Sequence, residues 1–175
     1  MPTHRGWLSL WKIKAPPRIL AFVWLALQNK ILTMDNLRRR KMLIVNACPL
    51  CLADEESVDH LFLHCKQTKA IWSAILKEFN CSWVIPPSFP DMFHQWACPI
   101  STSKGKIMWR LSLIAYYWTV WKERNRRCFE GTSSSLEDLI FKMKFFVASW
   151  ASILPDFRDL SLDALCFNWR EVISL

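Results

Sequence analysis

The sequence of 175 residues contains only three glycines, and this scarcity excludes several kinds of protein. Gly6, Gly105 and Gly131 lie too far apart to build a glycine-rich phosphate loop, and so few glycines disfavour a β-protein with many tight turns. Long apolar runs are also missing. The two longest, residues 19–27 and 111–121, are too short to cross a bilayer, so we expect no membrane contact through a spanning segment.

A disulfide framework and a secretory signal are missing as well. The seven cysteines are an odd number, and those outside residues 48–65 are single and scattered along the chain. The first residues show no charged start followed by an apolar run. We therefore expect a reducing intracellular compartment, which means the nucleus or the cytoplasm.

Potential metal ligands are concentrated in residues 48–65, where they follow the spacing C-x2-C-x8-H-x4-C. Cys48 and Cys51 can hold one ion from a tight turn, and His60 with Cys65 can complete a tetrahedral set. Three thiolates and one imidazole favour zinc over magnesium or calcium, which prefer oxygen ligands. Because four protein ligands leave no position for water, we predict a structural Zn²⁺ rather than a catalytic one.

The identity of the fourth ligand has one alternative. His60 and His64 are four residues apart and would share one face of a helix, as in zinc fingers that end in two histidines. The ligand set would then be Cys48, Cys51, His60 and His64. The loop between the two ligand pairs is shorter than in that class of zinc finger, so we favour Cys65.

Apolar residues recur at helical spacing along most of the chain. The expected helices cover residues 19–28, 35–41, 69–79, 104–129 and 140–154, and the first of them is apolar nearly all round, which predicts a central position in the core. Thr33, Ser57 and Ser135 are expected N-caps, and Pro155 ends the last helix. We predict an all-α fold, with a small zinc-stabilised helical module followed by a long helical hairpin.

The chain divides into four expected parts. Residues 1–82 form the zinc-binding helical domain, and residues 83–100 form a linker that contains several prolines. Residues 101–154 form the helical hairpin, and residues 155–175 form a C-terminal tail.

Positive charge is confined to two blocks. Residues 1–47 carry nine basic residues against one acid, residues 101–130 carry seven against two, and the rest of the chain is net negative. Basic blocks of this kind are typical of proteins that bind a polyanion, although a solvated surface gives the same pattern. The candidate contacts to nucleic acid are Arg38, Arg39, Arg40, Lys41, Lys122, Arg124, Arg126 and Arg127. Contacts to phosphates predict RNA or DNA binding that tolerates many sequences.

Several short motifs occur together between Trp7 and Phe79. They are Pro16-Pro-Arg with Phe22-x-Trp24, Leu32-Thr33 before Asn36-Leu-x-Arg-Arg40, Cys48-Pro-Leu-Cys51, Glu56-Ser-Val-x-His60-Leu-Phe, and Cys65 with Ile71-Trp72. In combination they resemble the zinc-binding domain of plant non-LTR (LINE-type) retrotransposon reverse transcriptases. Residues 118–129 resemble the helical segment that follows that domain. The resemblance implies His60 and Cys65 as the second ligand pair, a retroelement origin and a role in handling nucleic acid.

The residues for catalysis are missing. No Asp-Asp dipeptide is present for a polymerase, and the acids are too scattered for the carboxylate cluster of a ribonuclease H. A zinc ion would occupy Cys48 and Cys51, which removes them as nucleophiles. We predict that the chain is not an enzyme. It is expected to bind nucleic acid through basic helices. The alternative is a zinc-stabilised structural or interaction module, with a protein partner at the helical hairpin.

Overall fold

The computed structural model describes residues 9–175, apart from the side chain of His94, and every regular element in that range is a helix. The predicted all-α fold is therefore confirmed. In chain order the elements are η1 (Leu10–Lys12), α2 (Pro17–Leu27), α3 (Met34–Arg39), η2 (His60–His64), α4 (Lys66–Glu78), α5 (Phe89–Gln95), α6 (Ser103–Glu130), α7 (Leu136–Ala151), η3 (Pro155–Phe157), α8 (Leu162–Phe167) and α9 (Trp169–Ser174). Trp7, where the resemblance begins, lies outside the described residues.

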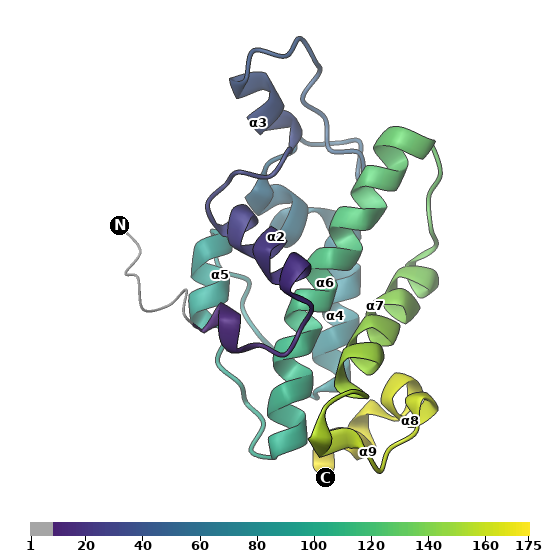
Figure 1. Cartoon of the computed structure of the whole chain (residues 1–175). Coiled ribbons are helices and arrows are strands. Elements are labelled where there is room, and N and C mark those ends of the chain that lie inside the picture. Colours follow the sequence, from purple (N-terminus) through teal and green to yellow (C-terminus); the bar gives the residue numbers. More distant parts are fainter. Residues whose placement is uncertain (1–8) are drawn as a thin grey trace.

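Helix α6 forms the centre of the molecule, with α2, α4, α7 and α9 packed around it (Figure 1). It begins where Thr102 Oγ1 accepts a hydrogen bond from the backbone N–H of Gly105, and it ends at Gly131, whose φ of 66° suits a residue without a side chain. Tyr116 and Tyr117 in its middle are fully buried. The expected span of residues 104–129 differs from the observed one by a single residue at each end.

Helix α7 runs back along α6 and completes the predicted hairpin, which is confirmed (Figure 1). Ser135 Oγ accepts a hydrogen bond from the backbone N–H of Asp138 at 3.1 Å, as the sequence predicted for this cap. Leu139, Met143 and Val147 recur every four residues and form the buried face.

Helix α2 does not take the central place that its apolar composition predicted. It packs on α6 through one face, which includes Val23 and Ala26, while Leu25 on the other side stays 38% exposed. The centre belongs to α6 because a helix of 28 residues can contact several shorter helices along its length.

The segments on either side of the hairpin also contribute to the core. Within the expected linker, α5 buries Phe89 and Met92, and the indole of Trp96 stacks on that of Trp109 with ring centroids 3.9 Å apart. Within the expected tail, α8 and α9 form, and Trp169 is fully buried. The division of the chain into four parts stays a prediction.

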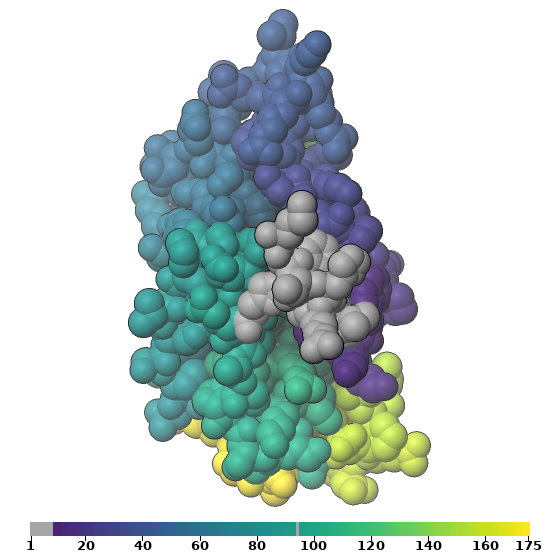
Figure 2. Space-filling view, turned by 90° about the vertical axis from the view of Figure 1, so that its left-hand side faces the viewer, coloured from purple at the N-terminus to yellow at the C-terminus, as the bar shows by residue number. Residues whose placement is uncertain are grey.

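The two ends of the molecule are formed by different elements. Helix α3 and the loop after it project at one end, while α8 and α9 lie at the other (Figure 1). The space-filling view shows the same projection, coloured blue, at the top of the molecule (Figure 2). Residues 38–41, the basic run at the end of α3, therefore lie at an exposed tip.

Candidate metal centre

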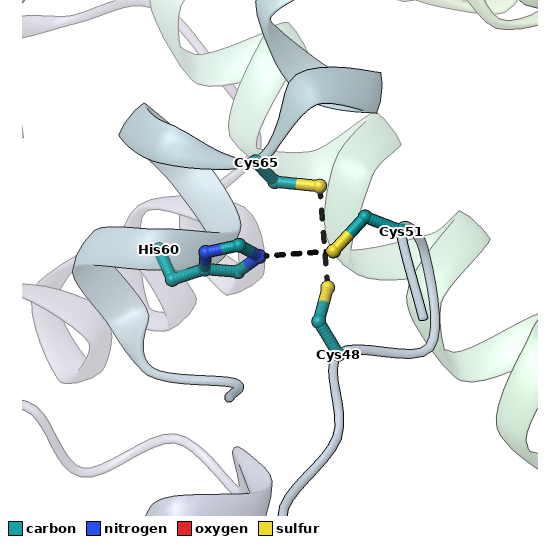
Figure 3. A group of neighbouring side chains, drawn as sticks. All are labelled: Cys48, Cys51, His60 and Cys65. Atoms are coloured by element: carbon teal, nitrogen blue, oxygen red, sulfur yellow. Dashed lines mark hydrogen bonds between the residues drawn. The ribbon is translucent and has the colours of Figure 1, made fainter. Parts of the chain in front are cut away.

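The first pair of thiols lies in a tight turn closed by backbone hydrogen bonds. The N–H of Leu52 donates to the carbonyl of Cys48 at 2.9 Å, and the N–H of Cys48 donates to the carbonyl of Asp54 at 2.8 Å. Leu52 has a φ of 55°, in the left-handed region that reverses the chain just after Cys51. The turn directs both sulfurs toward the helix that follows (Figure 3).

The second pair lies at the two ends of a π-helical turn, η2. Ser57 Oγ accepts a hydrogen bond from the backbone N–H of His60 at 3.0 Å, which confirms the predicted cap. Cys65 then leaves the helix with an extended backbone (φ −62°, ψ 128°) before α4 begins at Lys66. This kink turns the Cys65 sulfur toward the first pair of thiols (Figure 3).

The four side chains of Cys48, Cys51, His60 and Cys65 converge, and their ligand atoms all lie within 4.8 Å of one another. Cys48 Sγ lies 4.0 Å from Cys65 Sγ, and Cys51 Sγ lies 3.4 Å from His60 Nε2. Tetrahedral zinc with bonds of about 2.3 Å to sulfur and about 2.0 Å to nitrogen needs separations of about 3.8 Å and about 3.5 Å. The cluster is therefore consistent with a structural Zn²⁺ whose four tetrahedral positions are all filled by protein ligands.

Backbone groups around the sulfurs favour the thiolate forms that zinc requires. The N–H groups of Leu50 and Cys51 are hydrogen-bonded to Cys48 Sγ, and those of Gln67 and Thr68 are hydrogen-bonded to Cys65 Sγ. Hydrogen bonds to a thiolate lower the pKa of the thiol. Each of these two thiols thus receives N–H groups from the residues two and three positions later, an arrangement that suits a metal-bound sulfur.

Cys48 Sγ donates a hydrogen bond to Cys65 Sγ. This bond lowers the pKa of Cys65, while the same bond and burial raise the pKa of Cys48. A divalent metal would replace the proton of this bond and bind both sulfurs as thiolates.

His64, the alternative ligand, lies away from the cluster. Its imidazole is exposed and its Nε2 lies 3.1 Å from the carbonyl oxygen of Pro87. The backbone N–H of Cys65 donates to the carbonyl of His60 at 2.7 Å, and this i→i+5 bond of the π-helical turn places Cys65 beside His60. The structure brings Cys65 into the cluster in its place.

Helix α6 donates a hydrogen bond to the backbone beside each of the two ligand pairs. Tyr116 Oη donates to the carbonyl of Phe62, within the turn that carries His60, at 2.7 Å. Arg127 donates from its terminal nitrogen to the carbonyl of Leu50, between the first two cysteines, at 2.9 Å. A helix about fifty residues or more later in the chain therefore fixes the position of both ligand pairs.

The loop between the ligand pairs is held by a buried ion pair that the sequence analysis missed. Arg124 donates to both carboxylate oxygens of Glu56 at 2.8 Å, and the side chains are 3% and 0% exposed. Glu56 also accepts from the backbone N–H of Met34, the first residue of α3, at 2.7 Å. Glu56 and Arg124 both lie in segments that carry the resemblance, and this was the one feature of the sequence that could have indicated their pairing.

The candidate nucleic-acid contacts fall into two groups. Arg38, Arg39, Arg40 and Lys41 are exposed at the tip. Arg39 pairs with Asp35 at 2.8 Å, and Arg38 lies 3.8 Å from Glu55. In the described part of the chain, Arg40 and Lys41 have no ion-pair partner.

The second block is used mostly inside the protein. Arg124 is buried against Glu56, and Arg126 and Arg127 both pair with Glu123, at 3.4 Å and 2.9 Å. Of the four candidate contacts in this group, only Lys122 is exposed. The sequence could not distinguish these roles, because the partner of Arg124 lies 68 residues away.

The fold and the cluster define a helical zinc-binding module. Comparison with known families agrees, because residues 2–72 match the family described as zinc-binding in reverse transcriptase. This confirms the predicted resemblance for the part of the chain that contains the cluster. In residues 9–175, no helix combines the length and the apolar character needed to cross a bilayer.

A relative is found among plant proteins. A protein of Arabidopsis thaliana named "Putative ribonuclease H protein At1g65750" is 25% identical over 142 residues, which cover 81% of this chain. The chain spans 22% of the length of that relative. No solved structure matches the chain at a significant level.

Proposed function

We propose that this chain is a nucleic-acid-binding module of retroelement origin, in which Zn²⁺ held by Cys48, Cys51, His60 and Cys65 fixes an exposed basic tip. The observation that carries the proposal is the direct connection between the zinc loop and α3. Glu56 binds the first residue of α3, and Asn46 Oδ1 accepts from the backbone N–H of Glu56 at 2.9 Å.

The cations at the tip are placed for contact with a phosphate backbone. Arg38 lies in the last turn of α3, Arg40 and Lys41 directly follow that helix, and all three side chains are exposed. The loop that follows also exposes Leu43 and Val45, at 103% and 83%, which offers apolar contact to unstacked bases. Single-stranded RNA, with its splayed bases and accessible phosphates, fits such a tip better than a regular duplex.

The zinc has a structural role in this proposal. Its four protein ligands complete a tetrahedron and leave no coordination site for a substrate or a nucleophilic water. We propose no catalytic activity for the chain, and its location in the nucleus or cytoplasm stays a prediction.

An alternative function as a protein-interaction module is favoured by a different surface. Phe141 and Phe145 of α7 and Phe167 of α8 are 48%, 43% and 64% exposed and form an aromatic group on the hairpin side. Neighbouring exposed aromatic side chains are typical of surfaces that contact another protein.

The two functions can be separated by a salt titration with zinc present. Binding of a fluorescent single-stranded RNA should weaken with salt, with a slope of about −3 in log affinity against log salt for four phosphate contacts. Replacing Arg38, Arg40 and Lys41 together with Gln should remove about two units of that slope. The matched control replaces three exposed cations elsewhere, Lys106, Arg158 and Arg170, and keeps the same net charge.

The result supports the proposal if the tip variant loses the slope while its zinc content and the control variant stay as in the wild type. Equal losses in both variants would show unspecific charge attraction and overturn the proposed surface. No loss in either variant would favour the protein-interaction module.

A further inference from the structure

A cavity of about 250 Å³ lies between α6 and α7, and none of the four zinc ligands lines it. Lys122 and Arg126 line it from α6, Lys142 lines it from α7, and the apolar side chains of Leu139 and Phe146 add to its walls. The residues from α6 are three and four positions apart and so form one stripe along the helix. The cavity therefore combines cationic and apolar walls on two helices of the hairpin.

Two polar atoms of the cavity walls have no hydrogen-bond partner in the part of the chain that the structure describes. Thr119 Oγ1 belongs to a residue that is only 2% exposed, and Arg126 Nε is buried although the Arg126 side chain as a whole is 29% exposed. Both residues line the cavity. Buried donors without acceptors are rare in folded proteins because the hydrogen bonds that they made to water are lost and not replaced. Two of them beside one cavity indicate a ligand that carries acceptor oxygens.

The cations in and beside the cavity outnumber its acids. Of the two acids in the walls, Glu123 accepts from Arg127 Nε at 2.9 Å and from the backbone N–H of Ser134 at 2.8 Å. Burial alone would raise the pKa of Glu123, but these contacts outweigh it and lower that pKa below its ordinary value. Glu123 also pairs with Arg126 at 3.4 Å, and Arg127, which lies outside the cavity, adds a second cation beside it. With Arg127 counted, four cations stand against two acids, Glu123 and Glu130.

Two of the cations already converge on one oxygen. Ser134 Oγ accepts from a terminal nitrogen of Arg126 at 2.6 Å and from Lys142 Nζ at 2.8 Å. A hydroxyl oxygen with two cationic donors occupies the position that one oxygen of an oxyanion would take. The spacing of these donors is therefore suited to a tetrahedral anion.

We propose that this cavity binds a phosphate group. Arg126 would donate from Nε and a terminal nitrogen to two phosphate oxygens, a geometry that guanidinium favours. Lys142 and Lys122 would donate to the remaining oxygens, and Thr119 Oγ1 would supply a further donor. The phosphate belongs either to a nucleic-acid backbone or to free phosphate in solution. The proposal does not depend on the basic tip, which lies on other elements.

The test uses the full chain with zinc and two probes, inorganic phosphate and single-stranded RNA. Binding of each probe is measured through changes in the backbone amide chemical shifts. Phosphate should shift amides of residues 119–146. The double variant K122Q/K142Q changes exposed side chains and should weaken phosphate binding by about tenfold or more for each charge-assisted bond that is lost. The matched control is K104Q/K106Q in the first turn of the same helix. The variant T119V, which removes one donor without changing shape, should also weaken binding.

The two sources of phosphate give different results. If the backbone of RNA is the ligand, K122Q/K142Q should flatten the salt slope of RNA binding by about 1.4 units, whereas free phosphate as ligand would leave that slope unchanged. The tip variant R38Q/R40Q/K41Q should retain phosphate binding, so failure of the basic tip and failure of the cavity are distinguishable. The proposal is overturned if phosphate shifts no amide near the cavity, or if K104Q/K106Q weakens binding as much as K122Q/K142Q.

Discussion

Replacement of Arg124 by Met should be among the most damaging single changes on the polar side of this fold. The variant keeps a side chain of similar length but leaves the carboxylate of Glu56, which is 0% exposed, without its two 2.8 Å partners. Only the backbone N–H of Met34 remains as a donor to Glu56. Breaking a buried ion pair in this way costs about 3–5 kcal/mol of unfolding free energy.

A double-mutant cycle can separate the free energy lost with the ion pair from the free energy lost with the packing of the Arg124 side chain. Glu56→Gln keeps an acceptor for Met34 but removes the charge, so the double variant E56Q/R124M buries no ion and should recover much of the loss. A coupling free energy of about 2 kcal/mol or more between the two positions is expected. Arg158, exposed and without an ion pair in the described chain, provides the control R158M, which should stay within about 0.5 kcal/mol of the wild type.

The assay is urea unfolding followed by tryptophan fluorescence, with zinc in excess, because several tryptophans are buried in the core. Zinc affinity, measured by competition with a chromophoric chelator, should fall about tenfold in R124M because Glu56 holds the loop between the ligand pairs. The reasoning fails if R124M costs less than about 1 kcal/mol, or if the two single changes are simply additive.

Three further outcomes follow from the cluster and from its support. Metal analysis should find one equivalent of zinc in the wild type and in His64→Ala, but a large loss in Cys65→Ser; the opposite order would reassign the fourth ligand. A chelator should unfold residues 40–70 while α6 and α7 remain protected from hydrogen exchange, because ligand binding is coupled to local folding; uniform protection throughout would contradict this. Glu123 has a lowered pKa in the fold, so its stabilising contribution is complete above about pH 4.5 and disappears as the pH falls through the lower folded value. The destabilisation by Glu123→Gln, relative to the wild type at each pH, should therefore shrink in acid, and a constant difference would refute it.

The sequence by itself determined the type of metal site and most of the helices. The choice of three thiols and one imidazole fixes the preference for zinc whatever the fold, because ligand chemistry is local. The end of α6 and the cap of α7 were readable for the same reason, whereas α7 itself runs from Leu136 to Ala151 rather than over the expected residues 140–154, and Pro155 begins η3 instead of ending that helix. The Ser135 cap and the Gly131 stop act on backbone groups only a few residues away.

Tertiary structure decided which of the candidate residues are available for function. Nothing local separates Arg124 from Arg40, since both stand in basic stretches, yet one is buried against a carboxylate 68 residues away and the other is exposed. The choice of Cys65 over His64 likewise depends on a π-helical turn, which apolar periodicity does not reveal. Contacts between distant segments depend on how the helices pack, and for that reason the support of the zinc cluster by α6 became visible only in three dimensions.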